Sequence, residues 1–264
     1  MNQLSEHLKT PLVELLLSIA DDKFFLGHRV ADWTGLAPIL EEDIAFSSIA
    51  QDELAHALTL YEHIGRLTGR EADAVAYGRP ADAYRCADIT LASDDLNWDA
   101  AIARQFFCDH FDLLRVGRLS RSGDAEIAGL ARRIEAEERI HVEHVDHWIV
   151  QLGRAGGDPA TRMQASLNRL APSAVMLFEP TAGLADLERA GLYPDGAVDG
   201  TTSDMFQRWR DDLLRVTQNA GLKLTLTAPN LNAIGGRRGR HDPSFGALLE
   251  ELTEVYRVEP TARW

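Results

Sequence analysis

The chain has 264 residues, and 45% of them are hydrophobic, which is enough for a substantial core. It carries 41 acidic and 27 basic residues, a formal net charge of −14, and this balance disfavours nucleic acid or an anionic membrane surface as the main partner. No apolar run reaches the roughly 18 residues that span a bilayer, and the N-terminus does not resemble a signal peptide. Cys86 and Cys108 are the only cysteines. We therefore expect a cytoplasmic globular protein with reduced thiols.

Four helical patterns dominate the first 153 residues. Apolar residues recur there every three or four positions, which is the period of a helix with one buried face. The four segments span about 11–33, 38–65, 98–119 and 124–153. The stretch at 68–97 is rich in Asp, Ala and Gly without a sustained period, and it predicts an irregular crossover. Two long helical hairpins joined by such a crossover predict an all-α, ferritin-like four-helix bundle.

The last third of the chain is helical in pattern, but more weakly so. We expect helices near 160–178, 202–219 and 243–257. Strand-like alternation occurs only in LKLTLT at 222–227, which is too short to imply a sheet. The predicted organisation is a single ferritin-like domain over 1–264, with a core bundle at about 11–153 and additional C-terminal helices at about 154–264 packed on it.

Each of the four apolar stripes is interrupted near mid-helix by a polar side chain. The interruptions are Lys23, Glu53 with His56, Asp109, and Glu138 with His141. In both Glu-x-x-His pairs the spacing of three residues points a carboxylate and an imidazole to the same side of the helix. Di-iron centres in ferritin-like bundles use two such pairs plus one carboxylate from each remaining helix. The candidate metal ligands, with iron as the metal, are therefore Glu53, His56, Asp109, Glu138 and His141.

Lys23 occupies the position at which the first helix would donate the remaining carboxylate. An ammonium there removes one ligand, and it needs anionic neighbours if it is buried. The alternative to a metal centre is a layer of ion pairs, with the histidines hydrogen-bonded alongside. Its members would be Lys23, Glu53, Asp109 and Glu138. A lysine that points inward supports this layer, whereas one that points outward supports the metal.

Two neighbouring acids bear on this assignment. Asp22 could replace the missing carboxylate if the first helix were rotated slightly, but we expect it to be a solvated charge beside Asp21. Asp112 competes with Asp109 as the acid of the third helix. Because only Asp109 keeps to the apolar stripe, we expect Asp109 to lie in the layer.

Four segments resemble a known family. They are FFLGHRVADWTGLAPILEEDIA (24–45), IARQFFCDHFDLL (102–114), EERIHVEHVDHWIVQLG (137–153) and GGRRGRHDPSFGALLEELTEVYRVEPTARW (235–264). Over nearly the whole chain the sequence is similar to the structural subunit of the bacterial phenylacetyl-CoA monooxygenase, also called the 1,2-epoxidase. The resemblance implies a ferritin-like, non-catalytic subunit that binds and stabilises a catalytic di-iron subunit, with electrons arriving from a separate reductase.

The Glu-x-x-His elements depart from the usual structural subunit of that family. QDELAH at 51–56 and EERIH at 137–141 resemble the ligand motifs of the catalytic subunit, and only Lys23 breaks the set. One interpretation is a non-catalytic partner in a hetero-oligomer, with self-association left open. The other is a di-iron oxidase or oxygenase that uses its own Glu-x-x-His pairs. The missing first-helix carboxylate favours the non-catalytic partner.

A cluster of basic residues lies in GGRRGRH at 235–241. Its members are Arg237, Arg238, Arg240 and His241. They could contact an acidic partner surface or a CoA phosphate, or they could form a solubilising loop, as charged loops commonly do.

Overall fold

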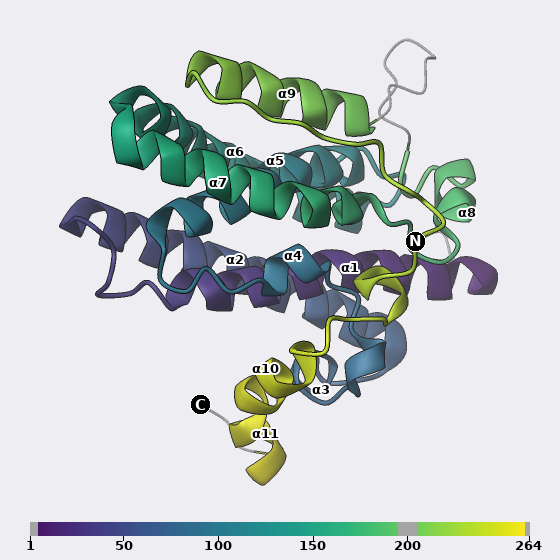
Figure 1. The fold of residues 1–264 in the computed structure, drawn as a ribbon. Coiled ribbons are helices and arrows are strands. Elements are labelled where there is room, and N and C mark those ends of the chain that lie inside the picture. Colours follow the sequence, from purple (N-terminus) through teal and green to yellow (C-terminus); the bar gives the residue numbers. More distant parts are fainter. Residues whose placement is uncertain (1–4, 195–204, 262–264) are drawn as a thin grey trace.

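The computed structural model describes residues 5–194 and 205–261. Within those ranges every regular element is a helix, so the fold is all-α as predicted (Figure 1). LKLTLT at 222–227 belongs to no regular element. No helix in the described ranges is long and apolar enough to cross a membrane.

Four long helices form the two hairpins that the sequence predicts. They are α1 (Glu6–Ala31), α2 (Leu40–Thr68), α5 (Trp98–Leu119) and α6 (Ala125–Ala155). The backbones pack closely within the α1/α2 pair and within the α5/α6 pair, but much less closely between the pairs. Figure 1 shows the two pairs as separate layers. Side chains therefore fill the space between the hairpins.

The helix boundaries differ from the prediction where Pro or Gly was taken as a boundary. α1 begins at Glu6, and Pro11 lies inside it. α2 continues through Gly65 and ends before Gly69, whose φ of +73° is readily adopted by glycine. Gly65 permits a close approach instead, because a Cβ at this position would lie 2.5 Å from the carbonyl oxygen of Arg70.

The crossover is less irregular than predicted. It contains α3 (Ala72–Ala76), the 3-10 turn η1 (Ala81–Ala83) and α4 (Asp88–Leu91). Tyr84 and Ile89 are fully buried, and the indole of Trp33 donates to Asp94 Oδ2 at 3.0 Å. Apolar and polar contacts therefore both hold the crossover against the bundle.

The C-terminal third adds further helical elements to the bundle. They are α7 (Gly157–Ala174), η2 (Val175–Phe178), α8 (Leu184–Arg189), α9 (Met205–Asn219), η3 (Gly236–Arg238), α10 (Phe245–Leu252) and α11 (Glu254–Val258). α7 and α9 pack on the α5/α6 hairpin, whereas α10 and α11 lie on the side of α3 (Figure 1). The predicted helices near 160–178 and 243–257 are confirmed, each divided into two elements. The helix predicted at 202–219 is described from Met205 on, because 202–204 lie outside the described ranges. The short helix α8 was not predicted.

The hydrophobic core is divided into two clusters along the bundle axis. On each long helix one cluster ends and the other begins within a few residues. The two residues on either side of the boundary are Phe25 and Leu26 on α1, Ala50 and Ala57 on α2, Phe111 and Val116 on α5, and Ile134 and Val145 on α6. The polar residues that interrupt the stripes fall in or beside these four gaps. They therefore form one polar layer between two apolar cores.

Candidate functional site

Lys23 points inward, into the polar layer. Its side chain is fully buried, and its Nζ donates to Glu53 Oε1 at 3.1 Å and lies 2.8 Å from Asp112 Oδ2. It also donates to Glu138. One ammonium from α1 thus contacts an acid from each of α2, α5 and α6. We call Lys23, Glu53, Asp112, Glu138 and His141 the lysine layer.

The acids of the layer keep Lys23 charged. Burial by itself would lower the pKa of the ammonium, but Asp112, Glu138 and Glu53 outweigh this effect and raise the pKa well above its usual value. The same contact acts in the opposite direction on Glu138. Burial would raise the pKa of that carboxyl, whereas Lys23 and the ion pair with His141 lower it below its usual value. Lys23 and Glu138 are therefore an ionised pair at neutral pH.

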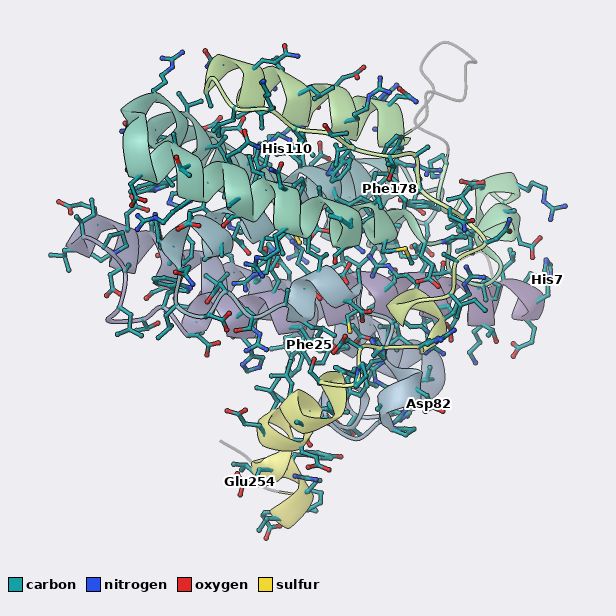
Figure 2. All side chains as sticks on the ribbon, viewed as in Figure 1. His7, Phe25, Asp82, His110, Phe178 and Glu254 are labelled. Carbon is teal, nitrogen blue, oxygen red and sulfur yellow. The ribbon has the colours of Figure 1, made fainter. Side chains whose placement is uncertain are left out.

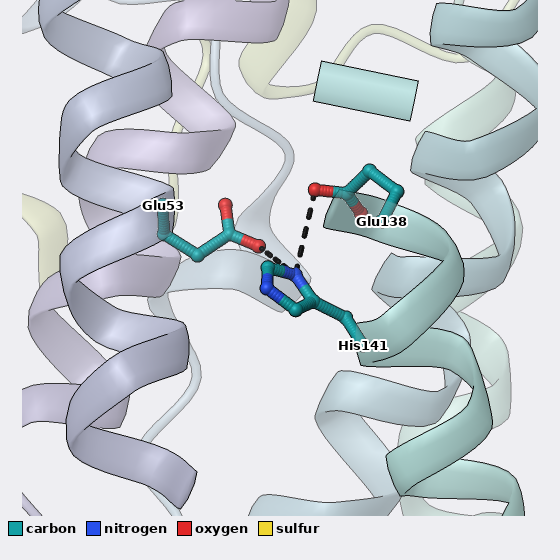
Figure 3. Close-up of side chains that lie close together, drawn as sticks. All are labelled: Glu53, Glu138 and His141. Atoms are coloured by element: carbon teal, nitrogen blue, oxygen red, sulfur yellow. Dashed lines mark ion pairs between the residues drawn. The ribbon is translucent and has the colours of Figure 1, made fainter. Parts of the chain in front are cut away.

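His141 connects α6 to α2. Its Nδ1 lies 3.5 Å from Glu53 Oε1 and 3.5 Å from Glu138 Oε1 (Figure 3). Its Nε2 lies 3.3 Å from Asp52 Oδ2, on a side chain that is 44% exposed. Burial would lower the pKa of the imidazole, but the ion pairs with Glu138 and Glu53 raise it to about 11. His141 is therefore an imidazolium at neutral pH.

His56 makes the reciprocal connection from α2 to α6. Its Nδ1 lies 3.6 Å from Glu138 Oε1, and its Nε2 pairs with Glu137. Glu137 is a half-exposed neighbour of Glu138, just as Asp52 is the neighbour of Glu53. Each imidazole thus links a buried acid to an acid near the surface of the opposite helix.

The acid of α5 that pairs with Lys23 is Asp112 rather than the expected Asp109. Asp109, one turn earlier, accepts from Gln105 Nε2 at 3.3 Å, and its Oδ2 has no hydrogen-bond partner in the described part of the chain. Burial, together with the charge of Glu138, raises the pKa of this carboxyl well above its usual value. The apolar stripe did predict that Asp109 is buried. It did not separate the two acids, because α5 is buried on most of its faces.

Asp22 is buried rather than solvated, and so is Asp21, contrary to our expectation. Asp21 accepts from the hydroxyl of Tyr61 at 2.7 Å and pairs with Arg79 of the crossover. Successive residues of a helix point about 100° apart. Asp21, Asp22 and Lys23 therefore face three different partners, and α1 is enclosed in all three directions.

Asp22 binds two arginines that are far from it in the sequence. Its Oδ2 accepts from Arg115 Nη1 at 2.8 Å and from Arg237 Nη2 at 2.6 Å. Arg237 Nη1 also donates to the carbonyl oxygens of Ser18 at 2.8 Å and Arg85 at 2.9 Å. We call Asp22, Arg115 and Arg237 the tail anchor, because together they attach the C-terminal turn to α1 and α5.

The tail anchor gives the basic turn a role that the sequence analysis missed. Arg237 is only 2% exposed, so it is not available to a partner surface or a CoA phosphate. Arg238 Nε donates to Glu179 Oε1 at 2.8 Å, whereas Arg240 is exposed. The signal that could have pointed to an internal partner is the Asp21-Asp22 pair, which follows the mainly apolar run LLLSIA, since buried acids need cations.

A metal does not fit the layer as it is arranged. One ligand atom each from Glu53, Glu138 and His141 lies within 4.8 Å of the others, and all three residues are buried. Lys23 already contacts both carboxylates, and its ammonium lies where a metal would need these oxygens. His56 contacts Glu138 at the edge of this group. Iron at the five candidate ligands, as a weak or vestigial site, remains a prediction.

The fold and the layer together define a class of protein. Two helical hairpins whose Glu-x-x-His pairs face each other in the core are the arrangement of ferritin-like carboxylate proteins. Sequence comparison identifies one family within this class. The model of the family described as "Phenylacetic acid catabolic protein" matches residues 1–264, so the chain belongs to that family. The chain is also 28% identical, over 269 aligned positions, to the C subunit of the 1,2-phenylacetyl-CoA epoxidase of Escherichia coli (strain K12), with 100% of both chains covered. The family resemblance that the sequence segments carry is thus confirmed.

Proposed function

We propose that this chain is the structural, non-catalytic subunit of a multicomponent oxygenase that epoxidises phenylacetyl-CoA in phenylacetate catabolism. In this role it binds and stabilises the catalytic di-iron subunit. Membership of the family and full-length similarity to one subunit of the Escherichia coli epoxidase support its place in such a complex.

The position of Lys23 carries the non-catalytic part of the proposal. A di-iron centre needs anionic and neutral donors around a vacant space, but here an ammonium fills that space and contacts Glu53, Asp112 and Glu138. The three acids that contact this ammonium have a buried cation as their partner, as buried charges need. A layer satisfied in this way supports the fold of a subunit and leaves the oxygen chemistry to its partner.

Co-expression tests the partnership. The chain and the catalytic subunit of the same complex are produced together with a tag on one of them, and then separated by size-exclusion chromatography with light scattering. We expect a single peak whose mass corresponds to a hetero-oligomer. Two separate peaks, each with the mass of one component, would contradict the proposal.

Metal analysis tests the non-catalytic role independently of the partner. We expect the purified chain to contain iron, manganese and zinc near background after aerobic reconstitution. Lys23→Glu should raise iron affinity, because it removes the cation and supplies the missing carboxylate. Lys223→Glu, at an exposed lysine, makes the same change of charge away from the layer and should leave the metal content unchanged.

The second candidate function is a metal-binding protein that uses its own Glu-x-x-His pairs. The convergence of Glu53, Glu138 and His141 within 4.8 Å favours it. Stoichiometric metal in the wild-type chain that is lost in Glu138→Ala would establish this function, and oxygen consumption would then have to be measured. Background metal in both proteins would leave the structural subunit as the better assignment.

A further inference from the structure

Exposed apolar side chains gather where α1 connects to α2. Leu36, Ile39, Leu40 and Ile44 are each between 52% and 70% exposed, although all four are large and apolar. Single exposed residues of this kind are common on soluble proteins, but a group of them in one place marks a surface for another molecule. This end of the bundle is therefore a candidate docking surface.

Leu96, on the loop before α5, adds a fifth side chain. It is 60% exposed, and its φ of +55° is rare for a residue with a bulky side chain. The loop lies against the α1–α2 connection, because the Trp33 indole donates to Asp94 Oδ2 at 3.0 Å and the ring centroids of Trp33 and Trp98 are 5.2 Å apart. Figure 1 shows both segments at the same end of the bundle. We call Leu36, Ile39, Leu40, Ile44 and Leu96 the apolar end patch.

Hydrogen bonds hold the patch in place. The backbone N–H of Leu36 donates to the carbonyl oxygen of Trp33 at 2.8 Å, and that of Leu96 donates to Asp94 Oδ1 at 3.0 Å. Trp33 and Asp94 are both buried, so they attach the two exposed segments to the core. A surface that is already ordered loses less conformational entropy when a partner binds.

Acidic residues lie among the patch residues in the sequence. They are Asp32, Glu41, Glu42, Asp43 and Asp95, and of these Asp32, Glu41 and Asp95 are exposed. No lysine or arginine occurs between Arg29 and Arg66 or between Arg85 and Arg104. Two copies of the chain that met through this patch would place like charges together, which costs energy. The charges therefore favour a different partner, one with basic residues around its own apolar surface.

We propose that the apolar end patch binds the catalytic subunit of the oxygenase, through an apolar surface on that subunit with lysine or arginine side chains at its rim. The apolar side chains of both subunits then leave water together, and the partner's cations face Glu41 and Asp95. This inference rests on the proposed function, which supplies the catalytic subunit as the occupant. It adds the surface that this subunit binds and the charges that select it.

Binding kinetics of the full-length chain on immobilised catalytic subunit test the apolar part of the proposal. Leu40→Ser combined with Ile44→Ser removes two exposed apolar side chains of the patch and should weaken binding at least about tenfold, because their burial no longer contributes. Val255→Ser combined with Val258→Ser is the matched control. Both valines are exposed on α11, the helix of Glu254, which lies apart from the α1–α2 connection (Figure 2), and this double variant should bind as the wild type does.

Glu41→Lys tests the charge of the rim. It should slow association about threefold or more, because charges at a rim act mainly on the association rate, and added salt should slow association of the wild type. Glu250→Lys makes the same change of charge at an exposed position of α10 and should leave the rate nearly unchanged. An association rate that responds neither to salt nor to Glu41→Lys would overturn the basic rim of the partner.

The outcomes separate this inference from the proposed function. If the wild type binds the catalytic subunit, and the variant with Leu40→Ser and Ile44→Ser is folded by circular dichroism and binds equally well, the patch is not the docking surface although the proposed function stands. If the wild type does not bind at all, the proposed function is contradicted and the inference fails with it. Light scattering of the chain alone tests the other occupant. A wild-type dimer that dissociates in this double variant would make a second copy the partner and would overturn the inference.

Discussion

The lysine layer and the tail anchor are both buried ionic clusters, but they connect different parts of the chain. The layer joins α1, α2, α5 and α6 through side chains at mid-helix. The anchor joins α1 and α5 to a turn whose Arg237 lies 215 residues beyond Asp22 in the chain. Asp112 belongs to both networks, because it contacts Lys23 on one side and Arg115 on the other.

The difference shows what each cluster does for the fold. The layer fixes how the two hairpins face each other, because the contacts of Lys23 with Asp112 and Glu138, and of His141 with Glu53, cross from one hairpin to the other. The anchor fixes where the C-terminal turn is attached, because Arg237 has one acid and two carbonyl groups as partners at the end of its side chain. A buried ion pair adds little net stability compared with apolar residues, but breaking one is costly. The contribution of each cluster to the free energy of unfolding should therefore be measured in variants that remove one charged partner at a time.

The largest effect is expected for Lys23→Met. This change leaves Glu53, Asp112 and Glu138 close together without their common cation, and it should lower the free energy of unfolding by about 4 to 5 kcal/mol. Urea unfolding followed by circular dichroism measures the loss. Adding Glu138→Gln to Lys23→Met should recover part of it by removing one of the repelling charges.

The exposed Lys223 provides the control for this experiment. Lys223→Met should change the free energy of unfolding by less than about 0.5 kcal/mol, as is usual for surface positions. A loss of similarly small size in Lys23→Met would mean that the ammonium does not hold the layer together. Breaking an ion pair would then be costly in the tail anchor but not in the layer.

A smaller loss, about 3 kcal/mol, is expected for Arg237→Met. Asp22 keeps Arg115 as a partner, but two buried carbonyl groups lose their donor. Limited proteolysis should also cleave the chain faster after residue 227, because the turn is no longer attached. Arg240→Met removes an exposed arginine of the same turn and should affect neither measurement. Equal behaviour of the two variants would contradict the anchoring role of Arg237.

The layer could be predicted from the sequence because its residues belong to helices. Helical period placed Glu53, His56, Glu138 and His141 on buried faces, and two hairpins brought those faces together. The same rule failed between Asp109 and Asp112. Both acids are buried on α5, and only the position of Lys23 determines which of them enters the layer.

The tail anchor could not be predicted in this way. Arg237 lies in a short 3-10 turn, so no period indicates which way its side chain points. Its partner Asp22 lies on a helix that is buried on several faces. The helical period therefore does not show whether Asp22 points to the core or to solvent. Contacts between residues so far apart in the chain depend on how the whole C-terminal third packs, and the local pattern does not contain that information.

The two clusters should also respond differently to pH. The pKa of His141 is about 11 in the folded chain, above its ordinary value of 6.5, so the folded state retains a proton that the unfolded state releases. The resulting stability is complete below pH 6.5 and is lost as the pH rises toward 11, with a slope of up to about 1.4 kcal/mol per pH unit. Glu138 acts oppositely: its lowered pKa gives stability above pH 4.5 that is lost on acidification. In the anchor, burial would lower the pKa of Arg115, but Asp112 and Asp22 raise it above its usual value, so Arg115 stays charged as the pH rises toward 11.

Urea unfolding between about pH 7 and pH 10 measures the alkaline part of this dependence. The wild-type chain should lose stability with a steeper slope than His141→Gln, in which the titrating imidazolium is absent. Equal slopes in the two proteins would show that His141 is not held protonated by Glu53 and Glu138.

The smallest effect is expected for Asp109→Asn, and it distinguishes the two acids of α5. Burial raises the pKa of Asp109, so the folded chain favours the neutral carboxyl, whereas the unfolded chain ionises freely at pH 7. Replacing it with a neutral amide of similar shape removes this cost and should raise the free energy of unfolding by about 1 kcal/mol at pH 7. The gain should disappear near pH 4, where the unfolded carboxyl is also protonated.

Asp112→Asn, which weakens the contacts to both Lys23 and Arg115, should destabilise the chain at pH 7. If Asp109→Asn is the more damaging change, Asp109 carries the charge in the layer and the assignment of Asp112 is wrong.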